Sequence, residues 1–286
     1  MPPPHPEPTR AAFHGTVEER RAIAALPGQK PEILVLLAAD ADAGVRRAVA
    51  ENAGAPPHAD RLLAQDADAG IRAPLARKLA ARAPELLADE TEGAPRRGRL
   101  ARDALLLLAQ DVEACVRAAL ADVLADLPDA PRELVLLLAR DTALEVCEPL
   151  IRLSRALTEE DLESLVEDPP GPATREAVAR RLHLPARIAR ALVRCGEPAP
   201  VAALLRNGTA QLTPEMLHSL AARARAVPWL GEAICARPGL PAPLLSALLP
   251  ALAKEALERL SRRPDLPPAL RATVKERLSG CVVWSH

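Results

Sequence analysis

The sequence predicts an all-α protein, a right-handed superhelix (solenoid) of short helical hairpins, and three observations support this prediction. The segment Leu37–Arg46 returns almost unchanged as Leu63–Arg72, 26 residues later. Alanine, leucine and valine make up nearly all of the apolar content of 49%, and the chain has one Phe, two Trp and no Tyr. Candidate helix starts then recur at a similar period to the C-terminal end. A fixed period of this length is typical of stacked-repeat proteins.

Each copy of the repeated segment reads as two helices joined by a tight turn. In the first copy, Ile33, Leu34 and Leu37 have helical spacing and form one apolar stripe. Asp42 is placed to cap the next helix by accepting hydrogen bonds from backbone N–H groups, and Val45 begins a second stripe. Two short helices cannot bury both stripes alone, so each copy is expected to stack on the next.

The pattern continues along the chain with changes. The Leu-Ala-x-Asp turn returns at Leu108–Asp111 and Leu138–Asp141, but the second of these is followed by Cys147 where the other copies have Arg. Pro74 and Pro149 fall inside second helices, which we expect to start late or to bend. Later helix starts have a leucine before a cap or a first-turn proline: Leu157-Thr158, Leu184-Pro185, Leu212-Thr213, Leu240-Pro241 and Leu266-Pro267.

The predicted organisation follows the distribution of proline and charge. The charged, glycine-containing stretch 89–99 reads as a protruding loop, and the proline-rich stretch 168–172 predicts a bend between two lobes. The predicted parts are a disordered tail at 1–16, N-terminal helical repeats at 17–168, C-terminal helical repeats at 169–280 and a second tail at 281–286.

Composition disfavours several classes of protein. The net charge of −1 gives no overall attraction to nucleic acid or to anionic lipid. Five cysteines are widely spaced without a CxxC pair, which is typical of buried thiols in a reducing compartment. No apolar run reaches the length of a membrane span, and the N-terminal residues are not a signal peptide. We therefore expect a soluble, cytoplasmic protein.

The repeated turn resembles known helical-repeat families. Leu-Ala-x-Asp-x-Asp-x-x-Val-Arg is similar to the turn and second helix of HEAT-like repeats, and the period with proline-rich junctions resembles the leucine-rich-repeat variant type. The Leu-Thr-x-x-Asp-Leu segment and Asn207-Gly208-x-Ala resemble an uncharacterised bacterial helical family of unknown function.

The HEAT-like resemblance implies a ladder in which turn aspartates pair with the following arginines of neighbouring repeats. Cys147 departs from this pattern, so the ladder is expected to stop or change there, and Arg175 is a candidate for resuming it. The ladder residues implied by the motif are Asp40, Asp66, Asp111, Arg46, Arg72 and Arg117.

Catalytic and metal-binding motifs are not recognisable in the sequence. The Asp40/Asp42 and Asp66/Asp68 pairs raise the alternative of a calcium site, but no glycine-turned 12-residue loop surrounds them, which favours caps and ladder partners. The six histidines lack ligand spacing, and GxSxG, HExxH and a phosphate-binding glycine loop are absent. We expect no cofactor and no enzymatic activity.

The remaining expectation is a binding role. Stacked helical pairs present an extended concave surface suited to a protein or peptide, and we expect an acidic or amphipathic segment to dock near Arg175, Arg180 and Asn207. The alternative is a helical-repeat nucleic-acid binder or a DNA-glycosylase-like enzyme. Arginines between residues 175 and 194 favour that alternative, whereas the scarcity of aromatic side chains for base stacking disfavours it.

Overall fold

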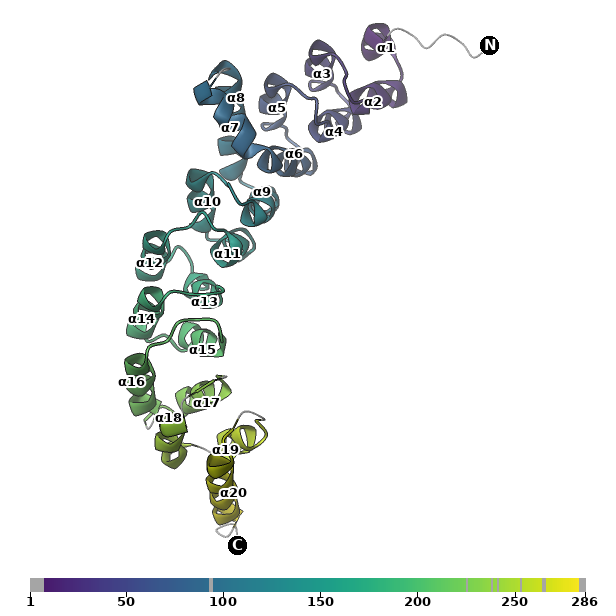
Figure 1. Cartoon of the computed structure of the whole chain (residues 1–286). Coiled ribbons are helices and arrows are strands. Elements are labelled where there is room, and N and C mark those ends of the chain that lie inside the picture. The colour runs from purple at the N-terminus through teal and green to yellow at the C-terminus, as the bar shows by residue number, and fades with distance from the viewer. Residues whose placement is uncertain are drawn as a thin grey trace. The chain divides into compact units, whose positions relative to one another are not determined.

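The computed structural model describes residues 8–282, except for 93–94, 225, 238, 241, 253 and 264–265. Throughout this part of the chain the secondary structure is helical, with no strand and one short 3-10 turn at Leu249–Ala251 (Figure 1). Within the same residues, no helix combines the length and the hydropathy that crossing a membrane requires.

The chain divides into two compact units, residues 1–157 and 158–286. The sequence placed this boundary after Asp168. The difference arises because the helix Glu159–Glu167 (α12) packs on the helices that follow it, Thr174–Ala179 (α13) and Ala186–Cys195 (α14). The proline-rich stretch 168–172 is therefore a connection inside the second unit.

The N-terminal unit (residues 1–157) is built from helical pairs. The first helices of the pairs are α1, α3, α5, α8 and α10, the second helices are α2, α4, α6, α9 and α11, and α7 lies between the pairs α5/α6 and α8/α9. Their bounds are Pro8–His14 (α1), Val17–Ala25 (α2), Pro31–Leu37 (α3), Ala43–Glu51 (α4), Pro57–Leu63 (α5), Ala69–Ala81 (α6), Ala83–Glu92 (α7), Pro95–Ala109 (α8), Ala114–Asp126 (α9), Arg132–Ala139 (α10) and Leu144–Leu153 (α11).

The turn aspartates begin the second helices by capping them. The side chain of Asp42 accepts a hydrogen bond from the backbone N–H of Val45 at 3.0 Å, and Asp68 accepts one from Gly70 at 2.7 Å. These bonds satisfy donors that lack a carbonyl partner inside the helix. Thr16 and Glu19 form a reciprocal capping box at the start of α2.

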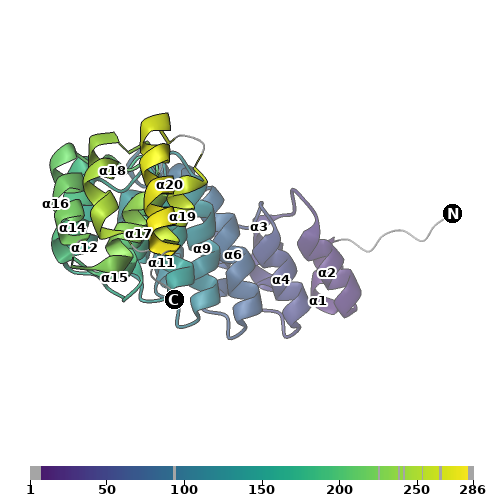
Figure 2. The same cartoon turned by 90° about the horizontal axis from the view of Figure 1, so that it is seen from below.

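The second helices lie in a row, with α2, α4, α6, α9 and α11 each packed against the next (Figures 1 and 2). The first helices α3, α5, α8 and α10 make a parallel series of contacts. Apolar side chains from both series are buried between them, among them Leu34, Val45, Leu75 and Leu120, each 0% exposed. Each pair therefore buries its stripes with the help of its neighbours.

Several expectations about local structure are corrected. The tail predicted at 1–16 contains α1, which is held by contacts with α2 and α3 and buries Ala12. The loop predicted at 89–99 is largely helical, since α7 runs to Glu92 and α8 begins at Pro95, and these helices pack together. The first two residues of the tail predicted at 281–286 belong to α20, which ends at Val282, and residues 283–286 lie outside the described residues.

The two internal prolines do not delay their helices. Pro74 lies inside α6 and Pro149 inside α11, and both helices begin at the same place in the turn as α4 and α9. Each proline is the sixth residue of its helix. The helix therefore gives up one N–H bond near its N-terminal end, and packing against neighbouring second helices compensates for this loss.

The C-terminal unit (residues 158–286) repeats the arrangement with different helices. One row contains α12, α14, α16, α18 and α20, and the other contains α13, α15, α17 and α19, with contacts between neighbours in each row. Apolar clusters around Leu220 and Leu260 fill the space between the rows. The remaining bounds are Pro198–Arg206 (α15), Pro214–Ala224 (α16), Pro228–Ala236 (α17), Ala242–Leu248 (α18), Lys254–Ser261 (α19) and Pro268–Val282 (α20).

Candidate interaction surface

A row of arginine–aspartate pairs links the turns of the N-terminal unit. In each pair, Nε and Nη2 of an arginine donate to the two carboxylate oxygens of an aspartate in the following turn, with Nε to Oδ2 distances of 2.5–2.7 Å. Bidentate pairs of this kind fix both the distance and the orientation of the groups they join. The pairs, hereafter the ladder, are Arg20–Asp40, Arg46–Asp66, Arg72–Asp111 and Arg117–Asp141.

Each ladder residue also bonds to the backbone. Nη1 of Arg72 donates to the carbonyl of Asp66 in its own turn at 2.5 Å, while Oδ1 of Asp111 accepts from the backbone N–H of Glu113 at 2.9 Å. Every ladder arginine makes the same kind of carbonyl contact, and every ladder aspartate accepts from the N–H two residues later. An arginine therefore connects its own turn to the next one.

The structure brings together all six residues that the HEAT-like resemblance implied. It adds Arg20 and Asp141, which the sequence reasoning did not include. Arg72 binds the carboxylate of Asp111 in the next turn, and it contacts Asp66 of its own turn through the backbone carbonyl. Asp141 was identifiable because it ends the same Leu-Ala-x-Asp turn as the other ladder aspartates. The arginine that binds it comes from the preceding pair, so the change at Cys147 does not affect it.

The pKa values of the ladder carboxyls are lowered. For Asp40 the hydrogen bond from Arg20 is the largest influence and lowers the pKa. For Asp66, Asp111 and Asp141 burial is the largest influence and would raise the pKa, but the arginine hydrogen bond, a backbone N–H and the guanidinium charge outweigh it. Of the four carboxylates that suggested a calcium site, Asp40 and Asp66 are thus engaged by arginine and backbone donors, and Asp42 and Asp68 cap helices.

The ladder ends at Cys147, which occupies the arginine position after Val146. Its side chain is buried, and burial raises the pKa of the thiol to about 11. In the C-terminal unit Arg175 makes a related but different contact: Nε donates to the carbonyl of Val166 at 2.7 Å and Nη1 to Oε1 of Glu197 at 2.5 Å. One carboxylate oxygen replaces the bidentate contact of the ladder.

A second set of polar contacts joins the C-terminal ends of second helices. Nδ2 of Asn52 donates to the carbonyls of Ala24 and Leu26, and Nδ2 of Asn207 donates to those of Ala179 and Arg181, 26 and 28 residues earlier in both cases. Nη1 of Arg263 makes contacts of the same spacing with Cys235 and Arg237. These donors satisfy carbonyls that the end of a helix leaves without partners.

Lys78 occupies the position of Asn52 in the next pair and adds a charge partner. Its Nζ lies 3.2 Å from the carbonyl of Asn52 and 2.6 Å from Oδ1 of Asp60. The two side chains are 10% and 7% exposed. Burial is the largest influence on both groups, and it raises the pKa of Asp60 and lowers that of Lys78.

The three residues expected to bind a partner all have internal contacts. Arg175 bridges α13 to Glu197 and its side chain is 19% exposed, Arg180 pairs with Glu176, and Asn207 bonds to the preceding helix end. The neighbouring arginines Arg187 and Arg194 pair with Glu163 and Glu167. Carboxylates therefore accompany much of the basic cluster at 175–194.

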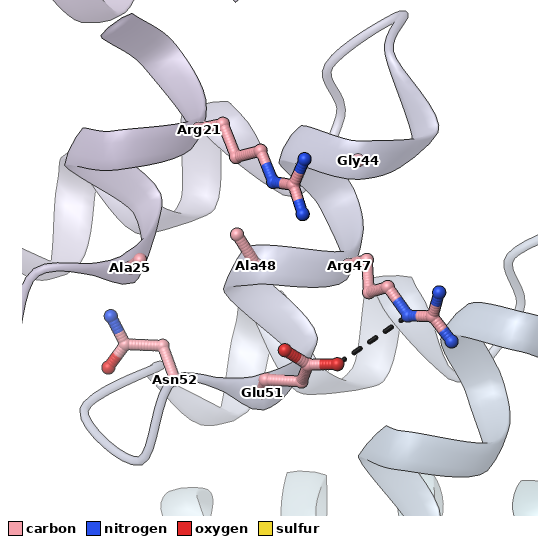
Figure 3. Close-up of a pocket in the computed structure, with 7 residues that line it drawn as sticks. All are labelled: Arg21, Ala25, Gly44, Arg47, Ala48, Glu51 and Asn52. Carbon is pink, nitrogen blue, oxygen red and sulfur yellow. Dashed lines mark ion pairs between the residues drawn. The ribbon is translucent and has the colours of Figure 1, made fainter. Parts of the chain in front are cut away.

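The arginine pocket lies between α2 and α4 in the N-terminal unit, with a volume of about 300 Å³ (Figure 3). Arg21 extends from α2 towards α4, where a Cβ at Gly44 would lie 3.8 Å from its Cδ. Arg47 points outward from α4 and pairs with Glu51 at 3.5 Å, with both side chains more than half exposed. The pocket is lined by Arg21, Ala25, Gly44, Arg47, Ala48, Glu51 and Asn52.

Arg21 differs from its neighbour Arg20, which belongs to the ladder. Within the described part of the chain no carboxylate forms an ion pair with Arg21, and its side chain is exposed. Sequence reasoning missed this residue because its position, one after the ladder arginine, is Arg in two pairs and Ala or Glu in the others. We call the outward surface of α2, α4, α6, α9 and α11 the second-helix face, and the pocket is part of it.

Comparison with known proteins places one similarity in the C-terminal half. No curated protein matches the chain. One segment of the chain matches a family model. It begins one residue before Cys147, where the ladder ends, so the pocket and the ladder lie N-terminal to it. Residues 146–281 are similar to a family described as an uncharacterised protein conserved in bacteria (DUF2336).

Proposed function

We propose that the chain is a non-enzymatic, cytoplasmic adaptor whose second-helix face binds a segment of a partner protein. In this proposal the helical pairs form a right-handed solenoid of the HEAT-like type. The observation that carries the proposal is the arginine pocket, where two guanidinium groups flank a floor of small side chains.

The chemistry of the pocket suits a carboxylate. Guanidinium groups bind planar anions through paired N–H donors, and Arg21 has donors that no carboxylate of the described residues engages. The pair between Arg47 and Glu51 is exposed and long, so exchanging Glu51 for an incoming carboxylate costs little. Ala25, Gly44 and Ala48 leave room for the backbone of the bound segment.

The contacts within the rows of helices support the solenoid. Neighbouring second helices pack on each other throughout the N-terminal unit, and the ladder repeats one geometry from turn to turn. Repeated stacking of this kind makes extended surfaces on which several helices contribute to one binding site.

Nucleic-acid binding has less support. Carboxylates accompany much of the arginine cluster at 175–194, which reduces its attraction for phosphates. Trp229 packs against an apolar cluster of the C-terminal unit, and Trp284 lies outside the described residues. Phe13 is 60% exposed, and within the described part of the chain its ring lies beside that of His14.

A peptide-display selection on the purified full-length chain tests the proposal. We expect enrichment of peptides containing Asp or Glu, and loss of their binding in the double variant Arg21→Glu/Arg47→Glu. Arg206→Glu is the matched control, because it reverses an exposed arginine of the C-terminal unit. Thermal melts verify that the variants are folded.

Selected peptides that bind the double variant unchanged would remove the pocket from the proposal. A selection without enrichment, combined with retention of labelled DNA or RNA at physiological salt, would favour the nucleic-acid alternative instead.

A further inference from the structure

We infer that the second-helix face takes a charge-polarised protein segment, with its carboxylates over α2, α4 and α6 and its cations over α9 and α11. This inference rests on the proposed function and names the class of its partner. The exposed residues Arg21, Arg47 and Arg77 come from the first three of these helices, and Asp122 and Glu145 come from the last two.

The register of the ladder locates these charges on one face, since Glu145 lies two residues before the ladder position, where α4 has the pocket residue Gly44. One residue after the ladder position, the sequence along the row is Arg21, Arg47, Ala73, Ala118 and Glu148. Five residues after it, the sequence along the row is Ala25, Glu51, Arg77, Asp122 and Arg152, in which Arg77 on α6 is followed by Asp122 on α9. Both positions contribute to the lining of the arginine pocket in α4, through Arg47 and Glu51, so they face outward together.

Local pairs reduce this polarity without cancelling it. Glu51 lies beside Arg47 and Arg152 lies beside Glu148, each at 3.5 Å across one helical turn. Glu18, exposed on α2 at the position of Glu145 in α11, forms no ion pair with a described residue, and its charge opposes that of Arg21. Among the described residues, Arg21, Arg77, Asp122 and Glu145 belong to no ion pair, and their signs change between α6 and α9.

The spacing of the helices sets the length of the partner segment. Packed helices lie about 8–10 Å apart, so four steps from α2 to α11 cover about 32–40 Å. An extended chain advances about 3.3 Å per residue, which makes this distance about ten to twelve residues. Small residues between the charged positions, including Gly70, Ala73 and Ala118, leave space for such a backbone.

The alkylation rate of the Cys115 thiol indicates whether the second-helix face is covered. It is exposed on α9, at the position that Gly44 occupies in α4, whereas Cys195 is exposed in the C-terminal unit. Cys147 and Cys235 are buried with thiol pKa values of about 11, so they react slowly with alkylating reagents. A segment that crosses the face should protect Cys115 and leave Cys195 reactive.

The test uses two synthetic peptides of the same composition on the full-length protein. The block peptide carries four Glu, four Ala and four Lys in that order, and the alternating peptide mixes the same residues. We expect the block peptide to bind about tenfold more tightly in fluorescence anisotropy, a difference of about 1.4 kcal/mol. We also expect it to slow alkylation of Cys115 but not of Cys195.

Crosslinking then determines the orientation. A photoreactive group at the Glu end should label α2 or α4, and in the variant Arg21→Glu/Arg77→Glu/Asp122→Lys/Glu145→Lys it should label α9 or α11. Equal affinity of the two peptides, or labelling that does not move in this variant, would overturn the polarity. If the peptides selected by display are uniformly acidic and require Arg21 and Arg47, the proposed function stands and this inference fails.

Discussion

The two units of the chain hold similar helical pairs together with different polar chemistry. In the N-terminal unit, four bidentate ion pairs link successive turns, and all four need an ionised carboxyl group. In the C-terminal unit, Asn207 and Arg263 donate to backbone carbonyls, which do not titrate, as Asn52 also does in the N-terminal unit beside the ladder. Helical stacking therefore does not require the ladder, and the two units should respond differently to acid and to mutation.

Acid should give the largest difference between the units. The pKa values of Asp40, Asp66, Asp111 and Asp141 are lower in the folded state, so the stability that they contribute is present above the unfolded-state pKa of about 4 and is lost as the pH falls through the lowered values. Asp60 changes the stability in the opposite direction as the pH falls, because its pKa is raised in the folded state. It is a single group, whereas four ladder carboxyls have lowered pKa values.

Hydrogen exchange of the full chain, followed by mass spectrometry and corrected for intrinsic rates, measures this difference. Peptides from residues 17–153 should lose protection between pH 4 and pH 2 before peptides from 158–282 do. Simultaneous loss in both regions would mean that the ladder does not set the acid stability of its unit.

Removing one member of the buried Asp60–Lys78 pair should have the largest effect of any single substitution. Asp60→Ala leaves the Lys78 ammonium buried beside one carbonyl, and we expect a loss of about 3–5 kcal/mol in the free energy of unfolding, measured by denaturant titration.

The corresponding positions of other pairs supply the control. Leu34, Leu105 and Val135 stand where α5 has Asp60, and each is 0% exposed. The double variant Asp60→Leu/Lys78→Met should therefore recover most of the loss. A double variant as unstable as Asp60→Ala would show that the pair has a positioning role that apolar packing cannot replace.

Within the ladder, Arg72→Ala should cost about 1.5–3 kcal/mol, because it leaves the carboxylate of Asp111 without its guanidinium partner in a largely buried site. Asn207→Ala removes an uncharged donor from two carbonyls and should cost about 1 kcal/mol. Denaturant melts compare the two, with the exposed residue Arg206→Ala as the reference. Equal losses would contradict the distinction between the units.

Sequence patterns predicted the helical pairs and their caps because these features recur at a fixed spacing, whereas six of the eight ladder residues were implied by the resemblance to HEAT-like repeats. The period could not reveal that each arginine binds the aspartate of the next turn, which is a property of packing. Arg20 lacks the Leu-Ala-x-Asp signature before it, and the insertion of α7 separates Arg72 from Asp111 by 39 residues. The pocket escaped prediction because its lining comes from α2 and α4 together, and the sequence does not show which of their residues meet.

Charged composition was a poor guide to local structure in the segment 89–99. Glycine and clustered charge suggested a loop, yet α7 ends at Glu92 and α8 begins at Pro95. Alanine, glutamate and arginine are strong helix formers, and packing between α7 and α8 stabilises both helices. Arginine and glutamate occur on many helix surfaces because they favour helix, so the sequence did not show which of them could bind a partner.

The smallest expected effect concerns one backbone conformation that different helical pairs supply with different residues. His183 has a φ of 54°, in the left-handed region. The carbonyl contacts of Asn52, Asn207 and Arg263 align it with Gly28 and Gly239, which have φ values of 74° and 69°. A side chain is strained in this conformation, whereas glycine adopts it readily but loses more entropy on folding.

His183→Gly should therefore stabilise the protein by about 0.5–1 kcal/mol, and Gly28→Ala should destabilise it by about 1 kcal/mol. Nothing lies within 4 Å of a Cβ built on Gly28, so the second substitution tests the backbone alone. The backbone N–H of His183 donates to Oγ1 of Thr209, and glycine keeps this bond. Thermal melts of both variants decide the matter: a loss of stability in His183→Gly would show that the imidazole makes a contribution larger than the strain it imposes.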